Sequence, residues 1–486
     1  MKIRETPGLT FDDVLLVPGR SAIASRSAVN TSARLTNRIT VAIPIISANM
    51  DTVTESEMAI AMARAGGLGV IHRFMSVERQ VTEVVRVKRK ESFVIENPAS
   101  IEMDQPISAA LELMDHIKVG GLIVKDHAGK LVGILTNRDI LFAPDHQAPV
   151  SAIMTPRERL VTLTAVDISG ADLETARVLI HKYRIEKLPL LDSHGNVIGI
   201  ITAKNILKHS LYPQATKDNK GRLRVGIAVG VKTEDLHRAE ACVAAGADII
   251  VLDIAHAHSD HAIKMVYELK KRFPDVDLIA GNVATGDGVR DLAEAGADAI
   301  KVGVGAGSIC VTRIVTGFGV PQLTAIIDCA VVGKELDIPI IADGGLRTSG
   351  DITKAIAAGA QTVMVGSLLA GTEESPGAPV VRDGQKVKII RGMASLTANI
   401  DRQSVEKGIV VEPADWEQVV PEGVEAVVPY RGEVVDILHQ LVGGLRSGMS
   451  YAGATTIPEL QEKAEFVRIT AAGVRESGSH DVQRIG

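Results

Sequence analysis

The chain has 486 residues, of which 46% are hydrophobic and 23% are charged, so it is not intrinsically disordered and can form large folded domains. Its formal charge of −6 argues against a general nucleic-acid-binding protein but allows a local phosphate site. Three cysteines (Cys242, Cys310 and Cys329) are too few for a disulfide framework, so a reducing compartment is expected. The sequence shows no apolar leader and no apolar run of about 18 residues, which predicts a cytoplasmic protein without a membrane span.

Eight short apolar runs alternate with helical patterns, which is typical of βα units. The predicted strands are Ile43–Met50, Leu68–His72, Arg224–Gly230, Ile249–Ile254, Asp277–Val283, Ala299–Gly305, Ile338–Gly345 and Thr362–Ser367. Each run is nearly continuous in apolar residues, as expected for a strand that is buried on both faces. Eight such strands predict a (β/α)8 barrel, with an open doubly wound sheet as the alternative.

An internal repeat occupies the gap of about 150 residues between the second and third predicted strands. The first copy ends GKLVGILTNRDIL, with Thr136 and Asp139, and the second ends GNVIGIITAKNIL, with Thr202 and Asn205. The two copies are offset by 66 residues, from Thr136 to Thr202. We therefore predict a barrel in two parts, 1–95 and 214–486, around an insert at 96–213.

The segment GVGAGSICVTRIVTGFG, residues 303–319, is the strongest candidate for chemistry. It follows a predicted strand and therefore lies at the C-terminal mouth of the barrel, where the active sites of this fold occur. Its glycines leave backbone groups uncovered, so the loop can hold a cation through carbonyls or an anion through amides. Cys310 lies in this loop, and a cation at Arg313 together with oriented amides would favour its thiolate. The alternative for a lone cysteine is a small buried apolar residue, as expected for Cys242 and Cys329.

Two further loops follow the last two predicted strands and resemble phosphate cradles. They are ADGGLR, residues 342–347, and VGSLLAG, residues 365–371. Asp343 is a candidate acceptor for two ribose hydroxyls, and the alternative is an acid that caps the next helix. Residues 372 to about 435 show little barrel pattern and are predicted to form a flap. Within this flap, Glu422 stands between proline and glycine and is a candidate acid–base group.

Together these residues resemble the family of inosine-monophosphate dehydrogenases and GMP reductases. The resemblance covers nearly the whole chain, through LTFDDVLLVPGRS, SANMDTVTE, GSICVTR, IADGGLRTSGDI, GSLLAGTEESPG, VPEGVEA and GGLRSGMSYAGA. It implies a barrel with an insert, a homotetramer or octamer, a purine 5′-monophosphate substrate (GMP or IMP) and a nicotinamide cofactor. The repeat itself resembles a pair of cystathionine-β-synthase (CBS) motifs, a Bateman module, which implies regulatory purine nucleotides held by Thr136, Asp139 and Thr202. Asn205 departs from the acid of that motif. The alternative is a purely structural domain that binds no ligand.

The resemblance also implies individual site residues. Cys310 would attack C2 of the purine, while Thr312 and Glu422 would transfer protons. The implied substrate-binding residues are Ser308, Asp343, Gly344, Gly345, Gly366, Ser367, Gly392, Met393 and Glu422. The implied cofactor-binding residues are Asp253, Asn282 and Gly303. A K⁺ site is implied at Gly305, Gly307 and the Cys310 carbonyl, completed by Glu476 and Ser477 of a neighbouring subunit.

Three departures bear on which family reaction to expect. The dehydrogenases hydrolyse the intermediate with an Arg-Tyr pair on the flap, whereas here Gln403 follows Arg402 and no tyrosine lies between residues 399 and 421. Asn49 replaces the usual alanine of the dehydrogenases, and Ile390 replaces their phosphate-binding tyrosine. We therefore expect a GMP reductase that uses NADPH, with an IMP dehydrogenase that uses NAD⁺ as the alternative. A nucleotide-sensing scaffold without turnover is the minor alternative.

Overall fold

The computed structural model describes residues 3–91, 94–117, 119–141, 143–165, 173–407 and 420–478. The chain divides into two compact units. The first comprises residues 1–88, 214–216 and 223–486, and the second comprises residues 89–213 and 217–222. The second unit thus coincides with most of the segment that we predict as an insert.

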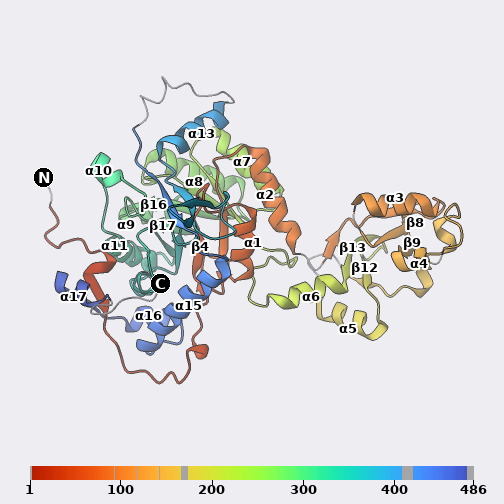
Figure 1. The fold of residues 1–486 in the computed structure, drawn as a ribbon, viewed down its shortest axis with the longest axis horizontal. Coiled ribbons are helices and arrows are strands. Elements are labelled where there is room, and N and C mark those ends of the chain that lie inside the picture. The colour runs from red at the N-terminus through yellow and green to blue at the C-terminus, as the bar shows by residue number, and fades with distance from the viewer. Residues whose placement is uncertain are drawn as a thin grey trace. The chain divides into compact units, whose positions relative to one another are not determined.

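The first unit contains a closed barrel of eight parallel strands (Figure 1). In order around the barrel they are β4 (Ile45–Ser47), β5 (Leu68–Ile71), β14 (Gly226–Val229), β15 (Ile249–Asp253), β16 (Asp277–Val283), β17 (Ala299–Val302), β18 (Ile340–Asp343) and β19 (Thr362–Val365). All eight predicted strands are confirmed, and the open-sheet alternative is wrong. The observed strands are mostly shorter than predicted because several apolar runs continue into the loops at the mouth, as at Gly303, whose φ is +154°.

Helices connect successive strands and cover the barrel. They are α1 (Ser56–Arg64), α2 (Val77–Lys90), α7 (Thr233–Ala244), α8 (Asp260–Arg272), α9 (Gly286–Glu294), α11 (Gln322–Glu335), α12 (Ser349–Ala357) and α15 (Val434–Tyr451). Their starts follow local rules: Thr348 caps α12 by accepting the N–H of Asp351 at 3.1 Å, and Asp351 accepts the N–H of Thr348 in return. Such a cap stabilises a helix by about 1 kcal/mol. No helix in the described ranges is long and apolar enough to cross a membrane.

The second unit repeats one supersecondary pattern twice. In the first half, β8 (Gly121–Lys125) pairs antiparallel with β9 (Leu131–Thr136), and in the second half β12 (Lys187–Leu191) pairs in the same way with β13 (Val197–Thr202). Each hairpin belongs to a four-stranded sheet, and one apolar cluster contains Ile123 and Ile134 from the first half and Leu191 and Ile200 from the second. The register keeps the 66-residue offset, because Gly121 faces Thr136 and Lys187 faces Thr202.

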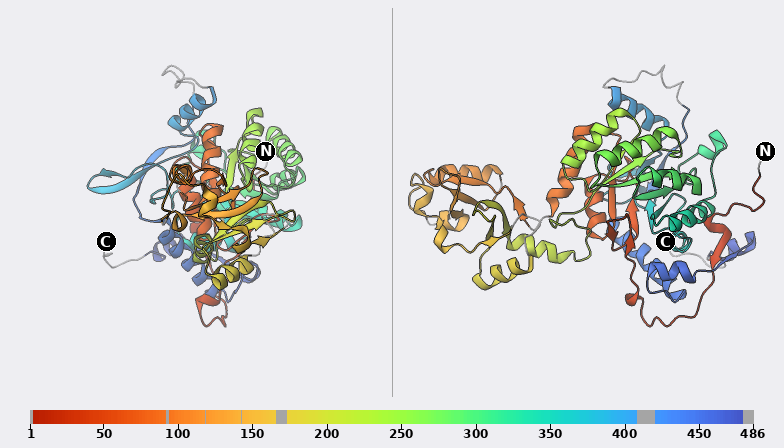
Figure 2. Two further views of the ribbon diagram at one scale, coloured as in Figure 1. Left: turned by 90° about the vertical axis from the view of Figure 1, so that its right-hand side faces the viewer. Right: turned by 180° about the vertical axis from the view of Figure 1, so that it is seen from behind.

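Part of the predicted flap forms strands and a helix. Strands β20 (Val380–Arg382), β21 (Gln385–Arg391) and β22 (Glu425–Pro429) form an antiparallel sheet, which Figure 2 shows as a projecting ribbon in cyan and blue. Helix α13 (Leu396–Lys407) follows β21. Residues 408–419, where the sequence analysis finds no flap tyrosine, lie outside the described residues, as do residues 479–486 of the C-terminal tail.

Two adjacent glycines of α15 provide a test of helix packing. A Cβ at Gly444 would lie 2.1 Å from the Ser349 hydroxyl of α12, whereas a Cβ at Gly443 would meet no atom within 4 Å. We predict that Gly444→Ala destabilises the protein by about 1–3 kcal/mol through overpacking, which lowers the melting temperature by several degrees. Gly443→Ala is the matched control and should be neutral or stabilising by up to about 1 kcal/mol, because alanine favours helix. Equal melting temperatures for both variants would contradict this packing.

Candidate active site

Two adjoining cavities open at the C-terminal mouth of the barrel. The first, of about 300 Å³, is lined by the predicted phosphate and ribose residues Ser308, Asp343, Gly344, Gly345, Gly366 and Ser367. The second, of about 380 Å³, is lined by Cys310, Thr312, Glu422, Gly392, Met393, Asp253, Asn282 and Gly303. Asp343 and Gly344 line both cavities. The structure therefore brings the predicted substrate, cofactor and catalytic residues to one end of the barrel.

The loop that carries Cys310 is paired with the turn that carries Glu422. The Val311 N–H donates to the Glu422 carbonyl at 2.9 Å, and the Val424 N–H donates to the Ile309 carbonyl at 3.0 Å. These two bonds flank Cys310, which forms a bridge with Gly423. The pairing holds the predicted nucleophile and the predicted acid–base group on one small antiparallel ladder, although they are 112 positions apart in the sequence.

Gly423 permits a third segment to join this pairing. A Cβ at Gly423 would lie 3.0 Å from the Ser395 nitrogen and 3.2 Å from the Gly392 Cα, closer than ordinary contact. The Gly392 N–H also donates to the Val424 carbonyl at 3.0 Å. The predicted base-binding residues Gly392 and Met393 are thereby held beside Cys310. Gly423 was not predicted as a functional residue, although its place directly after the candidate Glu422 in the PEG turn was a usable signal.

The side chains of Cys310, Thr312 and Glu422 form one hydrogen-bonded chain. The Thr312 hydroxyl donates to Glu422 Oε2 at 2.8 Å, and Cys310 Sγ lies 3.1 Å from Thr312 Oγ1. A threonine hydroxyl has a single proton, so with that proton directed at Glu422 the oxygen accepts from the thiol. The chain can carry a proton from sulfur toward the carboxylate, which is the arrangement that activates a nucleophile through a base.

Arg313 does not contact Cys310 in the way that its position in the sequence suggests. Its guanidinium donates to the Val320 carbonyl at 2.7 Å, and its aliphatic part packs against Gly305 and Gly319. Both glycines have positive φ and would clash with Arg313 if they carried a Cβ. The arginine therefore supports the 303–320 loop and lines the first cavity, so the expectation that it acts as the cation beside Cys310 is wrong.

Asp343 lies at the centre of a buried polar cluster. Its Oδ2 accepts from Asn282 Nδ2 at 3.0 Å and from Lys301 Nζ at 2.7 Å. The helix that follows is capped by Thr348 and Asp351, so the alternative that Asp343 is a capping acid is wrong. Gly344 and Gly345 both have left-handed backbones, with φ of +94° and +77°, which only glycine adopts freely. The sequence analysis missed Lys301, the one charged residue in the apolar strand β17.

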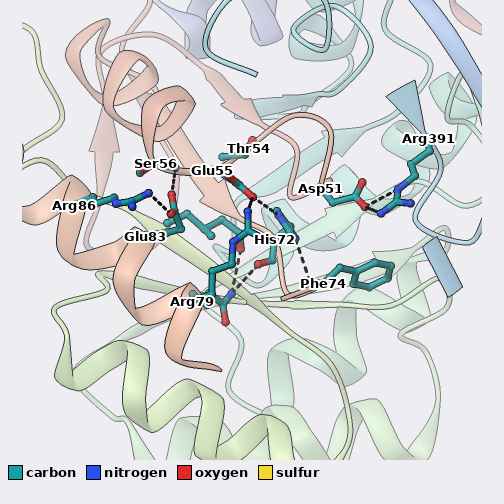
Figure 3. Close-up of polar contacts among 12 residues, drawn as sticks. Asp51, Thr54, Glu55, Ser56, His72, Phe74, Arg79, Glu83, Arg86 and Arg391 are labelled. Carbon is teal, nitrogen blue, oxygen red and sulfur yellow. Dashed lines mark hydrogen bonds and ion pairs between the residues drawn. The ribbon is translucent and has the colours of Figure 1, made fainter. Parts of the chain in front are cut away.

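Phe74, which lines the second cavity, is contacted by a group of buried and ion-paired side chains (Figure 3). Buried His72 accepts the Phe74 N–H at Nδ1, at 3.1 Å, so its other ring nitrogen faces Glu55, at 3.4 Å. The hydrogen bond from His72, together with the charge of Arg79, holds the pKa of Glu55 below its ordinary value despite partial burial. These contacts fix Phe74, which lines the cavity.

The flap helix α13 is attached to this group of side chains at two points. Arg391 Nε donates to buried Asp51 at 2.7 Å, as Figure 3 shows, and Arg391 Nη1 also pairs with Asp401 of α13 at 2.7 Å. The guanidinium of Arg402 lies 5.9 Å from the centre of the Phe74 ring, within the range of a cation–π contact. Arg402 lines the second cavity with Cys310. None of these contacts was predicted from the sequence.

The remaining predicted residues lie outside the two cavities or only partly in them. Of the K⁺ set, Gly305, Gly307 and Cys310 belong to the loop after β17, while Glu476 and Ser477 lie at the end of α17 (Ala471–Glu476) and line neither cavity. In the second unit, Thr136 and Asp139 line a cavity of about 340 Å³, whose lining does not include Thr202. Asp139 accepts from the Thr136 hydroxyl at 2.6 Å and N–H at 2.8 Å.

The fold and the site define a (β/α)8 barrel whose mouth holds a cysteine, a threonine and a glutamate in one hydrogen-bonded chain, as in an enzyme with an activated cysteine. Residues 8–480 match the model of the IMP dehydrogenase / GMP reductase domain. The chain belongs to this family of oxidoreductases.

Relatives of both activities match over nearly the full length. The chain is 54% identical over 475 residues to inosine-5′-monophosphate dehydrogenase of Nitrosopumilus maritimus, covering 98% of each chain. It is 50% identical over 486 residues to GMP reductase of Leishmania donovani, again covering 98% of each. A crystal structure of GMP reductase from Trypanosoma brucei, a cysteine-to-alanine variant in complex with guanosine 5′-monophosphate, superposes with a TM-score of 0.86 at 47% identity, covering 98% of both chains.

The three cysteines should differ sharply in reactivity. Burial raises the pKa of Cys242 to about 12, and burial together with the neighbouring charge of Asp328 does the same for Cys329. Both thiols are therefore protonated at about pH 7.5, whereas Cys310 lines an open cavity. Limited treatment with iodoacetamide, read by peptide mass spectrometry, should label Cys310 first, and GMP should slow the labelling. Preferential labelling of Cys242 or Cys329 in the folded protein would contradict this site.

Proposed function

We propose that the chain is a GMP reductase, which converts GMP to IMP and ammonia with NADPH. The sequence of helix α13 carries the choice of reaction: Gln403 follows Arg402 at the place where dehydrogenases of the family have a tyrosine. A glutamine side chain has no ionisable proton and cannot act with an arginine as a base toward water. A reductase needs no such base because its intermediate accepts a hydride instead of water.

In the proposed reaction Cys310 adds to C2 of the guanine ring as a thiolate, with its proton passing through Thr312 toward Glu422. The bond between C2 and the amino nitrogen then breaks, and the same chain returns a proton so that ammonia departs. Hydride adds to C2 of the resulting thioester-like adduct, the C–S bond breaks, and IMP leaves with the thiolate restored. Covalent capture thus divides one difficult substitution at an aromatic carbon into two easier steps.

The lining of the two cavities supports the proposed binding of both reactants. Ser308, Gly345, Gly366 and Ser367 would hold the 5′-phosphate through hydroxyl and backbone N–H groups. Asp343 would accept the ribose hydroxyls, and Gly392 and Met393 would contact the base. Asp253, Asn282 and Gly303 would hold the nicotinamide cofactor, which supplies the hydride when bound. All three residues line the second cavity, which also contains Cys310.

Asn49 provides a second argument for the reductase. Its amide donates to Asp253 Oδ2 at 2.9 Å. The alanine that dehydrogenases usually carry here cannot donate a hydrogen bond. The carboxylate of Asp253, which we propose faces the cofactor, therefore accepts a hydrogen bond that an alanine at position 49 could not donate. This difference agrees with the use of a different cofactor.

IMP dehydrogenase is the second candidate, and one specific observation favours it. Arg402 lines the cavity that contains Cys310, so an arginine is available near the reacting carbon. The similarity to dehydrogenases and reductases is nearly equal, at 54% and 50% identity, and does not choose between them. In this alternative NAD⁺ would remove hydride from IMP, and water would release XMP from Cys310.

We further propose a K⁺ site, an oligomeric state and nucleotide regulation from the resemblance, and a compartment from the sequence. Gly305, Gly307 and the Cys310 carbonyl would bind K⁺ with Glu476 and Ser477 of a neighbouring subunit, in a homotetramer or octamer. The second unit would bind regulatory purine nucleotides as a CBS pair, with Thr136 and Asp139 in its cavity. The protein would act in the cytoplasm.

Paired assays separate the two reactions. We predict that absorbance at 340 nm falls when the protein is mixed with GMP and NADPH, and that it hardly rises with IMP and NAD⁺. Cys310→Ala should abolish turnover, and Glu422→Gln should lower kcat by at least about 100-fold because proton transfer contributes that much to such reactions. Rapid NADH formation from IMP with no consumption of NADPH in the presence of GMP would contradict the proposal.

The regulatory proposal has its own test. Asp139→Ala should weaken the effect of added ATP and GTP on the rate, because it removes the predicted nucleotide-binding acid from the cavity of the second unit. Turnover without these nucleotides should stay within about twofold, since the barrel contains the predicted catalytic residues. Leu207→Ala, at an exposed side chain of helix α6 (Ala203–Leu211), is a control that should leave both the effect and the rate unchanged. An unaltered nucleotide response in Asp139→Ala would refute this site.

A further inference from the structure

Lys301 is a lysine in the interior of the barrel. It belongs to β17 (Ala299–Val302), whose four residues are all buried, and its side chain is 1% exposed. An ammonium group loses several kcal/mol of hydration when it is buried to this degree, so it persists only beside groups that compensate for that loss. Its neighbours in the strand, Ile300 and Val302, are fully buried apolar residues of the barrel core. The lysine is therefore an exception to the pattern of its own strand.

The Lys301 ammonium donates all its hydrogen bonds to side chains at the mouth of the barrel. Nζ lies 2.5 Å from Asp253 Oδ1 and 2.7 Å from Asp343 Oδ2, and it also donates to Asn282 Oδ1. These partners come from β15, β18 and β16 (Asp277–Val283), so one side chain joins the ends of four neighbouring strands. An ammonium has three protons, and these three acceptors satisfy it completely.

The surrounding contacts hold this arrangement in place. Asn282 donates to Asp343 Oδ2 at 3.0 Å and to the Gly303 carbonyl at 2.7 Å, so its amide oxygen is oriented toward Lys301. Gly281 lies against Lys301, because a Cβ there would be 2.5 Å from the lysine Cβ. Burial opposes the charge of Lys301, but the two carboxylates outweigh burial and raise its pKa above its ordinary value. Burial likewise opposes ionisation of Asp253, but Lys301 outweighs it and keeps the pKa of Asp253 below its ordinary value.

We propose that Lys301 is a positioning residue that couples the binding of the purine nucleotide to the binding of the nicotinamide cofactor. The inference rests on the proposed function in one respect, that Asp343 contacts the nucleotide and Asp253 contacts the cofactor. When a ribose hydroxyl binds to Asp343 or Asp253, the carboxylate that it contacts and the Lys301 ammonium lose conformational freedom together. The second carboxylate is then already ordered for its own ligand, so the second binding step costs less conformational entropy. Lys301 itself touches neither reactant.

The direct measurement is the mutual effect of two ligands that cannot react with each other. GMP and NADP⁺ form such a pair for a reductase. Isothermal titration should show that saturating NADP⁺ tightens GMP binding by about 5-fold or more, and GMP must tighten NADP⁺ binding by the same factor, since such coupling is reciprocal. In Lys301→Met, which removes the ammonium group and keeps the unbranched apolar part of the side chain, we expect this factor to fall to about one.

Lys388→Met is the matched control. Lys388 is also 1% exposed and lies in β21, but its ammonium donates to the carbonyls of Thr372 at 2.9 Å and Ser375 at 2.6 Å. Loss of this buried lysine should lower the melting temperature as Lys301→Met does, yet leave the coupling factor as in the wild type. If Lys301→Met does not fold, the charge-balanced double variant Lys301→Met with Asp253→Asn serves in its place, again with a factor of about one expected.

The outcomes separate this inference from the proposed function. If the wild type oxidises IMP instead of reducing GMP, the proposed function fails, and the coupling is measured with IMP and NADH as the unreactive pair. A wild-type factor of about one with the pair that suits its reaction would overturn the role of Lys301, whichever reaction is found. An unchanged factor in the folded Lys301→Met variant would overturn it as well.

Discussion

The active site depends on one backbone pairing, between residues 309–311 and residues 422–424. Without this pairing, the Cys310 thiol in the loop after β17 and the Glu422 carboxylate in the flap would not be held at a fixed distance from each other. With it, the Thr312 hydroxyl spans the remaining gap between Cys310 and Glu422. The glycine at 423 is the feature that permits a third chain segment to pack against this ladder. The geometry of the predicted catalytic residues is therefore set by contacts outside the barrel strands.

A second constraint is the charge at the barrel mouth. Two carboxylates that face the cavities are held around one buried ammonium, and the amides of Asn49 and Asn282 satisfy further oxygens. Polar groups buried in this way are fixed in place because any rearrangement leaves one of them unpaired. Under the proposed function, the mouth would present oriented acceptors to the nucleotide and to the cofactor at once, which a site made of separate exposed acids could not do. The flap adds its own attachment through Arg391 and its carboxylate partners.

Much of the architecture could be predicted because local patterns determine it. Continuous apolar runs indicated all eight strands, and repetition at 66 residues located the second unit's two halves. The loop at Cys310 and the PEG turn at Glu422 were found as motifs, but their mutual contact is long-range and has no local signal. Arg313 was misread for the same reason: proximity in sequence to Cys310 does not fix where a long side chain points, and its guanidinium donates to the backbone carbonyl of Val320 instead. Lys301 could have been noticed as a charge within an apolar strand, although its three partners could not.

The most direct test of the central claim is the fate of the adduct on Cys310. The protein is incubated with IMP, an oxidised nicotinamide cofactor and ammonium, the adduct is detected by intact-protein mass spectrometry, and released nucleotides are separated by chromatography. The account predicts that the adduct forms, that it is converted to GMP, and that XMP stays a trace product because Gln403 stands where the dehydrogenases have the tyrosine of their water-activating pair. XMP as the main product, released at a catalytically useful rate, would contradict it.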